Sequence, residues 1–227
     1  MPDYSKADHW SLKAQKEGYP ARSVYKLLEM DEKFNLLKGL KGVKGGSKPF
    51  KVLDLGAAPG SWSLYVLRQI PMQTGITGHQ NTQNEFMQIE PLLVSVDLSP
   101  LSRTCDQGLF NREDFCFIQG DFTLSEIRDA IFSKGPYGLI ISDAAPLTTG
   151  NRSVDTLRSL GLAEMALDFA ENVMVQGGSL VVKVFQGGDT AELLKNMRSS
   201  FASARSFKPK ACRAGSFETY YLGLGKN

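Results

Sequence analysis

Short runs of apolar residues, many of them β-branched, alternate along the chain with segments whose apolar residues recur at helical spacing. This alternation is typical of an α/β fold in which a mostly parallel sheet carries helices on both faces. The last strand is expected to form an antiparallel edge of that sheet. The predicted strands cover residues 50–55, 92–98, 115–118, 137–142, 179–185 and 218–224.

The predicted helices occupy segments between these strands. Apolar residues three or four positions apart indicate that residues 156–174 form the clearest helix, which Gly177 and Gly178 should end. Residues 62–70 and 190–201 are predicted to be helical as well. The apolar face of the longest helix consists of Leu160, Ala163, Leu167, Ala170 and Met174.

The N-terminal part of the chain carries a cluster of basic residues. Residues 4–37 are expected to form one or two helices, and residues 39–47 a Gly/Lys linker, so that residues 1–48 make a basic helical extension. Nucleic-acid binding and an ordinary solvated helix face both explain such a cluster. Its members are Lys6, Lys13, Lys16, Arg22, Lys26, Lys33, Lys38, Lys41, Lys44 and Lys48.

The composition is that of one globular domain. The 227 residues are 42% hydrophobic and 22% charged, so we expect residues 1–227 to form a single domain with a full core. Residues 72–90 are rich in Gly, Asn, Gln and Thr and are expected to be an inserted surface loop. A net charge of +2 is too mild to identify a nucleic-acid binder, so only the local cluster points that way.

Cysteine usage and hydropathy restrict the class of protein further. Cys105, Cys116 and Cys212 are odd in number and widely spaced, which indicates reduced thiols and no zinc site. No apolar run approaches the roughly 20 residues of a membrane span, and the N-terminus lacks the pattern of a secretory signal. We therefore expect a cytoplasmic protein without membrane contact or a metal ion.

A glycine-containing turn follows the first predicted strand. Residues 56–60 (GAAPG) join this strand to a helix, as in α/β folds that bind a nucleoside at the carboxyl ends of their strands, and the glycines let a ligand approach. Asp97, which ends the second strand, is placed to accept hydrogen bonds from ribose hydroxyls. Asp121, after the third strand, is placed to accept from an adenine amine, although either aspartate could instead cap a helix. Trp62 lines this pocket or packs its helix on the sheet.

Five segments form a recognisable set: residues 21–27 (ARSVYKL), 54–62 (DLGAAPGSW), 142–146 (SDAAP), 181–187 (VVKVFQG) and 216–220 (SFETY). Together they resemble the FtsJ/RrmJ-type ribose 2′-O-methyltransferases, in the same order from about residue 13 to residue 225. The resemblance implies a Rossmann-like fold, S-adenosylmethionine as methyl donor and RNA as substrate. It also implies an active site made of Lys26, Asp143, Lys183 and Glu218. The expected cofactor contacts are Gly56, Ala57, Pro59, Gly60, Trp62, Asp97, Asp121 and Asp143.

Methyl transfer to a ribose gives these residue types a purpose. A 2′-hydroxyl is a weak nucleophile, so the enzyme must align it with the sulfonium methyl group, which can contribute roughly 7–11 kcal/mol, and remove one proton. Lys183 is the candidate base or orienting group. A base at neutral pH needs a pKa of about 7–8 instead of about 10.4, a difference of roughly 4 kcal/mol. Repulsion from Lys26 would favour that shift, and the carboxylates of Asp143 and Glu218 would oppose it.

The resemblance favours 2′-O-methylation of a ribose, expected to be that of a uridine, in large-subunit ribosomal RNA by a monomeric enzyme. A tRNA anticodon-loop ribose methyltransferase stays open, because residues 15–19 (QKEGY) and 21–23 (ARS) also fit that branch. The chain departs from the family pattern in two places. Residues 147–150 (LTTG) lack the Asn expected after Pro146, and residues 72–90 are longer than in compact bacterial members.

Two readings come from other classes of protein. A non-catalytic module for binding RNA or a nucleoside would not need the four intact residues of the expected active site. A small-molecule methyltransferase would not need the basic N-terminal segment. Both are therefore disfavoured.

Overall fold

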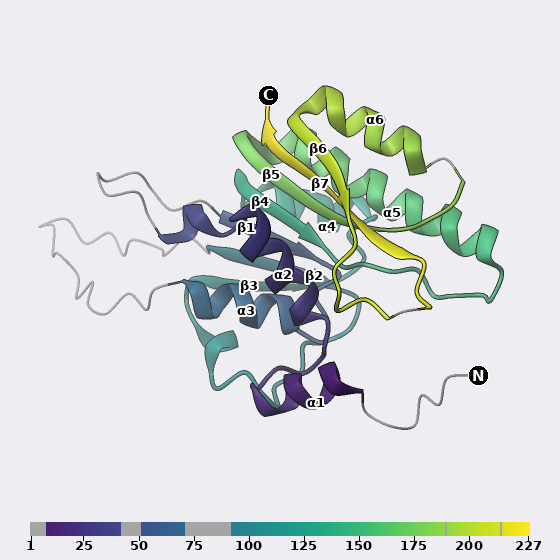
Figure 1. Ribbon diagram of the computed structural model, residues 1–227. Helices are drawn as coiled ribbons and strands as arrows, with labels where there is room; N and C mark the ends of the chain where they lie inside the picture. The colour runs from purple at the N-terminus through teal and green to yellow at the C-terminus, as the bar shows by residue number, and fades with distance from the viewer. Residues whose placement is uncertain (1–7, 42–50, 71–91, 189, 214) are drawn as a thin grey trace, which may run out of the picture.

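A seven-stranded sheet forms the centre of the molecule (Figure 1). The computed structural model describes residues 8–41, 51–70, 92–188, 190–213 and 215–227. The strands are β1 (Lys51–Leu55), β2 (Leu93–Asp97), β3 (Phe115–Gln119), β4 (Tyr137–Ser142), β5 (Met174–Phe185), β6 (Phe201–Phe207) and β7 (Glu218–Lys226). Their order is β3-β2-β1-β4-β5-β7-β6, parallel from β3 to β5, with β7 antiparallel to both β5 and β6.

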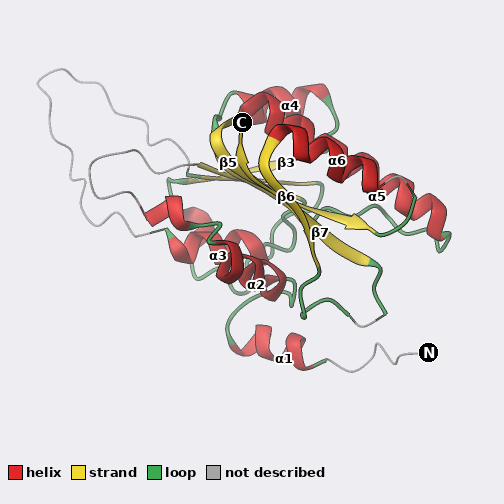
Figure 2. Cartoon of the chain, turned by 45° about the horizontal axis from the view of Figure 1, so that its top comes forward, coloured by secondary structure: helices red, strands yellow, loops and turns green. Residues whose placement is uncertain are grey.

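Helices cover both faces of this sheet, as predicted. Figure 2 shows α1 (His9–Lys16), α2 (Val24–Phe34) and α3 (Ser61–Gln69) on one side, and α4 (Ser125–Phe132), α5 (Arg152–Val173) and α6 (Thr190–Ser200) on the other. Two 3-10 helices, η1 (Lys38–Lys41) and η2 (Leu109–Asn111), lie among the connections. The predicted α/β class with a mostly parallel sheet is confirmed.

Alternation along the strands divides the apolar residues between two cores. On β1, Val52 packs with α2 and α3, whereas Leu53 and Leu55 pack with the helices of the opposite face. On β5, Val181 belongs to the first core and Val182 to the second. Because successive side chains of a strand point to opposite faces, polar residues at the same parity as Val52 and Val181 must face α2 and α3.

The N-terminal segment forms two helices, and α2 is a core element. The side chains of Leu27 and Met30, both on α2, are fully buried. Asn35 ends this helix in the left-handed conformation, with a φ of 53°. Residues 42–47 of the expected linker and the expected insertion at 72–90 lie outside the described residues.

The boundaries of the longest helix differ from the prediction. α5 begins at Arg152 rather than at residue 156, because the side chain of Asn151 accepts hydrogen bonds from the backbone N–H groups of Ser153 and Val154. Gly177 does not end this helix: β5 already begins at Met174, and Gly177, with a φ of 79°, lies within that strand where its register with β4 shifts.

The edge strand is also different from the predicted one. The predicted strand at 218–224 corresponds to β7, which lies inside the sheet, and the antiparallel edge is β6, for which no strand was predicted. Most β6 residues are small or polar and at least partly exposed, so the segment lacks the apolar signal of a central strand. The eight-residue helix α4 was not predicted either.

Candidate functional site

The four residues of the expected active site come from four separate elements. Lys183 lies on β5, Glu218 begins β7, Asp143 directly follows β4 and Lys26 lies on α2. Asp143 and Lys183 have the strand parity of Ile141 and Val181, which pack in the core beneath α2. The fold therefore brings the four side chains to one place on the α2 face of the sheet.

Two ion pairs connect these four side chains. The Nζ atom of Lys26 lies 2.9 Å from Oε1 of Glu218, and Nζ of Lys183 lies 3.1 Å from Oδ1 of Asp143. Lys183 also donates a hydrogen bond to the backbone carbonyl of Asp143. Only 9% of Lys26 and 7% of Lys183 is exposed, so both ammonium groups depend on these carboxylates in place of water.

Tyr220 is a fifth member of the cluster, and the sequence analysis gave it no role. It lies opposite Lys183 in the β5–β7 register and donates a hydrogen bond from its hydroxyl to Oδ1 of Asp143 at 2.6 Å. Lys26 lies over its ring, with Nζ 5.9 Å from the centroid. The alternation of side chains along the last strand could have identified it. Tyr220 lies two residues after Glu218 and therefore points to the same face of β7.

The pKa values of Asp143, Lys26 and Tyr220 are shifted in this cluster. Burial by itself would raise the pKa of Asp143, but Lys183 and Lys26 outweigh it, so that the pKa is lowered. Burial would lower the pKa of Lys26, but Asp143 and Glu218 outweigh it and raise the pKa. Burial, with the charges of Asp143 and Glu218, raises the pKa of Tyr220 well above its usual value. Asp143 is thus a carboxylate and Tyr220 a hydrogen-bond donor at neutral pH.

The glycine turn lies beside this cluster at the end of β1. Gly56 and Gly60 adopt φ values of 75° and 106°, in the left-handed region that favours glycine. A Cβ atom on Gly56 would lie 2.5 Å from Cα of Ala144, and one on Gly60 would lie 2.8 Å from the ring of Phe110. Both glycines are therefore required for the close packing of this turn on its own neighbours, which the ligand-centred argument from sequence did not foresee.

The two predicted acceptor aspartates lie at the ends of adjacent strands, with Asp97 as the last residue of β2. Asp97 accepts hydrogen bonds from the backbone N–H groups of Ala58, within the turn, and Ser99. Asp121 follows β3 and accepts from the backbone N–H and the hydroxyl of Thr123 through Oδ1. Because β2 and β3 are parallel neighbours, the two carboxylates lie at the carboxyl edge of the sheet together with the turn. Such acceptors suit the hydroxyl and amine groups of a nucleoside.

Trp62 has a packing role in the structure. Only 2% of the residue is exposed, its indole N–H donates to the carbonyl of Ser23 at 2.8 Å, and its ring lies 5.9 Å from that of Tyr220. Arg22 is likewise bound within the fold, because its guanidinium hydrogen-bonds to Asp8 and to the carbonyl of Ala211. Arg22 thus differs from the exposed lysines of the basic cluster.

Comparison with known proteins identifies the family. Residues 19–226 match the family model described as FtsJ-like methyltransferase. The chain belongs to the FtsJ-like methyltransferase family. Its fold is similar to that of a solved Plasmodium falciparum structure, described as a ribosomal RNA methyltransferase, at a TM-score of 0.63. That structure is 24% identical and covers 92% of this chain and 98% of its own, which shows a shared fold.

More similar relatives of this FtsJ-like methyltransferase carry one common name. A Treponema denticola protein named Ribosomal RNA large subunit methyltransferase E is 49% identical over 97% of this chain and 96% of its own length. A Borreliella afzelii protein of the same name is 40% identical over 95% of this chain and 96% of its own. The similarity therefore extends over nearly the full length of both relatives.

A buried carboxyl group lies beneath the turn of the methyltransferase, and the sequence analysis gave it no role. Asp54, on β1, is fully buried and accepts a hydrogen bond from Ser63 of α3 at 2.7 Å, and the hydroxyls of Ser63 and Ser95 lie 3.0 Å apart. Its other oxygen, Oδ1, has no hydrogen-bond partner among the described residues. Burial raises the pKa of Asp54 to about 7, and Asp143 and Asp97 add to this effect.

The loop after Pro146, which lacks the expected Asn, is held by a contact between Thr149 and Asp155. The backbone N–H and the hydroxyl of Thr149 both donate to Oδ1 of Asp155, at 2.7 and 2.9 Å. Asp155 belongs to the first turn of α5, so this loop is tied to the start of that helix. Leu147, which lies in the loop, is 89% exposed.

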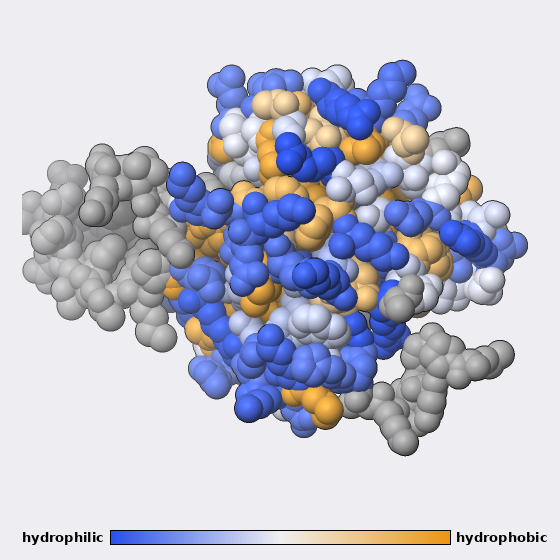
Figure 3. All heavy atoms as spheres, viewed as in Figure 1, coloured by the Kyte–Doolittle hydropathy of each residue, from blue (hydrophilic) through white to orange (hydrophobic). Residues whose placement is uncertain are grey.

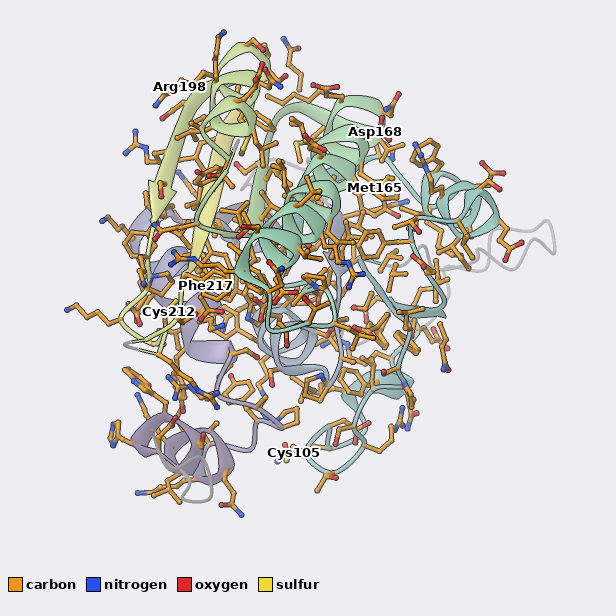
Figure 4. The ribbon with its side chains drawn as sticks, turned by 90° about the vertical axis from the view of Figure 1, so that its right-hand side faces the viewer. Cys105, Met165, Asp168, Arg198, Cys212 and Phe217 are labelled. Carbon is orange, nitrogen blue, oxygen red and sulfur yellow. The ribbon has the colours of Figure 1, made fainter. Side chains whose placement is uncertain are left out.

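The cysteines of the methyltransferase are all free thiols, and Figure 4 shows Cys105 and Cys212 far apart. Cys212 is buried, and burial together with Glu218 raises the pKa of its thiol to about 12. Within the described ranges, no group of three or more His, Cys, Asp or Glu residues could hold a metal ion. No described helix is both long and apolar enough to cross a membrane.

Proposed function

We propose that the protein transfers a methyl group from S-adenosylmethionine to a ribose 2′-hydroxyl, that of a uridine, in large-subunit ribosomal RNA. The observation that carries this proposal is the cluster of Lys26, Asp143, Lys183 and Glu218 beside the glycine turn, joined by two buried ion pairs. The relatives named Ribosomal RNA large subunit methyltransferase E support the RNA class. Family membership supports S-adenosylmethionine as the donor.

The turn and the strand ends would hold the cofactor. Asp97 would accept from its ribose hydroxyls and Asp121 from its adenine amine, because both carboxylates lie at the carboxyl ends of neighbouring strands, at the same edge of the sheet. When bound, S-adenosylmethionine supplies an electrophilic methyl group on a sulfonium. The proposed contacts are Gly56, Ala57, Pro59, Gly60, Asp97, Asp121 and Asp143, whereas the buried Trp62 packs within the fold.

The four clustered residues would align the ribose and assist the loss of its hydroxyl proton. As the 2′-oxygen forms its bond to the methyl carbon, the hydroxyl proton must leave. Lys183 accepts this proton as a neutral amine, or orients the hydroxyl as an ammonium while solvent takes the proton. Asp143 holds Lys183 in place through its side chain and its carbonyl. The pair of Lys26 and Glu218 holds the other side of the site.

We further propose that the protein acts in the cytoplasm as a monomer, on RNA. All four clustered side chains come from one chain, so the site needs no residue from a second copy. Lys13 and Lys16 of α1 and Lys33 of α2 would contact phosphates. Mapping of 2′-O-methylated positions in ribosomal RNA and tRNA, with and without the protein, tests the substrate. A methyl group that is lost from tRNA alone would favour the anticodon-loop alternative.

Substitution of Lys183 tests the mechanism. Lys183→Ala should lower the single-turnover rate of methyl transfer by about 10² or more, the usual scale for a positioned acid–base group. Lys183→Arg should also fail, because a planar guanidinium stays protonated and cannot replace a compact amine. Calorimetric titration with S-adenosylmethionine should give nearly unchanged affinity in both variants.

Lys195→Ala is a matched control, since Lys195 is exposed on α6 at the opposite face of the sheet. Near-normal rates in both Lys183 variants would remove this residue from the mechanism. Absence of heat with S-adenosylmethionine in the unmodified protein would contradict the proposed cofactor.

A further inference from the structure

A pocket of about 490 Å³ lies outside the proposed active site, between α1, α2 and the segment around the end of β6. Its volume is within the usual range of pockets that bind small molecules or parts of larger ones. Three aromatic and three lysine side chains are the part of its lining that indicates a ligand: Trp10, Tyr25, Phe207, Lys13, Lys33 and Lys210.

The aromatic rings and the ammonium groups are interleaved. The ring centroids of Trp10 and Tyr25 lie 5.0 Å apart, and Nζ of Lys13 lies 4.6 Å from the centroid of Tyr25. On the other side, Nζ of Lys33 lies 4.4 Å from the centroid of Phe207. Aromatic faces suit the stacking of bases, and lysines suit phosphates. Figure 3 shows mainly hydrophilic residues, with hydrophobic patches between them, on the face where α1 and α2 lie.

Two acidic residues also line the pocket, and their places are compatible with an anionic chain. Both carboxylate oxygens of Glu29 accept hydrogen bonds from backbone N–H groups, those of Lys210 at 2.8 Å and Ala211 at 2.9 Å. Glu29 thus holds the segment around Lys210 and Ala211, which forms one wall of the pocket, against α2. Glu32 is exposed, and the lining of the pocket carries three lysines against these two carboxylates.

The walls of the pocket are continuous with the proposed active site. Tyr25 directly precedes Lys26 on α2, and the segment that carries Lys210 leads on to Glu218. Arg22 joins the two walls by its hydrogen bond to the carbonyl of Ala211. The pocket and the proposed active site therefore share α2 and the segment between β6 and β7.

We propose that this pocket binds an unpaired nucleobase of the RNA substrate, near the ribose that is methylated, by stacking on the partly exposed rings of Trp10 and Phe207, while the buried Tyr25 supports Trp10. Lys13, Lys33 and Lys210 contact the flanking phosphates. This inference rests on the proposed function, because it requires an RNA substrate at the neighbouring site. It adds a second point of recognition that selects single-stranded over fully paired RNA.

Two variants separate the stacking from the charge. Trp10→Leu keeps an apolar side chain but removes the indole face, and Lys33→Gln with Lys210→Gln removes two exposed charges. We expect Trp10→Leu to weaken binding of an RNA hairpin with a single-stranded loop by about fivefold or more, measured by fluorescence anisotropy. The double lysine variant should reduce the slope of log Kd against log salt by about 1.4, for two phosphate contacts on a single strand.

Controls distinguish a failure of this inference from a failure of the proposed function. Lys195→Gln should leave hairpin binding unchanged, and every variant should keep its affinity for S-adenosylmethionine, which shows intact folding. A protein that methylates RNA but whose pocket variants bind the hairpin and a duplex as before would overturn the pocket. So would variants that lose only binding to assembled ribosomal subunits, which indicates a protein partner. No RNA binding by the unmodified protein would overturn both proposals.

Discussion

Replacement of Asp54 by Asn is expected to stabilise the protein more at pH 8 than at pH 5. Asp54 is fully buried, its Oδ2 accepts from Ser63, and its Oδ1 has no hydrogen-bond partner in the described part of the chain. Burial, opposed by the hydrogen bond from Ser63, raises its pKa to about 7 from 3.8. Folding therefore destabilises the charged form of this carboxyl group relative to the neutral form.

The sign and the size follow from proton linkage. The folded chain holds the proton up to about pH 7, whereas the unfolded chain releases it near pH 3.8. The free energy of unfolding therefore falls as the pH rises between these two values, by about 4 kcal/mol in total. About 2–3 kcal/mol of this loss falls between pH 5 and pH 7. Asn carries no such charge, so the variant should lack this part of the pH dependence.

Urea unfolding of both proteins at pH 5 and pH 8 measures the difference. The advantage of Asp54→Asn should grow by about 2–3 kcal/mol between the two pH values, with the slope against urea unchanged. An unpaired amide of Asn costs about the same at both pH values, so it cancels from the comparison. Asp129→Asn, at an exposed position on α4, is the control and should show no such growth. Equal pH dependence of Asp54→Asn and the unmodified protein would refute the reasoning.

Two further substitutions probe Tyr220 and the glycine turn. Tyr220→Phe removes the hydrogen bond to Asp143 at 2.6 Å and should cost about 1.5–3 kcal/mol in urea unfolding and slow single-turnover methyl transfer. Unchanged rates would place Tyr220 outside the reaction. Gly56→Ala puts a Cβ atom 2.5 Å from Cα of Ala144 and should cost about 1–3 kcal/mol and weaken S-adenosylmethionine binding in calorimetry. Gly161→Ala, in helix α5, adds a Cβ atom that would meet nothing within 4 Å, so it should instead stabilise the protein by about 0.5–1 kcal/mol. Similar effects of Gly56→Ala and Gly161→Ala on stability would contradict the steric argument.

Elements with strong local signals were predictable. Residues 137–142 form β4 with the predicted bounds, because a strand that is buried along its whole length reads as a nearly continuous apolar run. Helix α6 begins at Thr190 as predicted and ends one residue early. Local signals failed where burial is partial, as in β6, and where a side-chain cap set a boundary, as with Asn151 at the start of α5.

The sequence by itself determined which residues make up the candidate site. Lys26, Asp143, Lys183 and Glu218 could be named from short motifs, because a strand or helix carries the motif residues whatever surrounds it. The alternation of β5 and β7 also determined which residues share a face, although Tyr220 was not recognised from it. The resemblance to a family added a reaction to these residues.

Only the tertiary structure decided how these residues are paired and what surrounds them. Lys26 and Glu218 are far apart along the chain, and their contact at 2.9 Å exists because β7 inserts between β5 and β6 below α2. Packing of α3 on β1 also buries Asp54 and leaves its Oδ1 without a hydrogen-bond partner among the described residues. The aromatic and basic pocket likewise joins α1 and α2 to the end of β6. Such contacts depend on the crossovers between strands, and local sequence carries no record of the distances that these crossovers set.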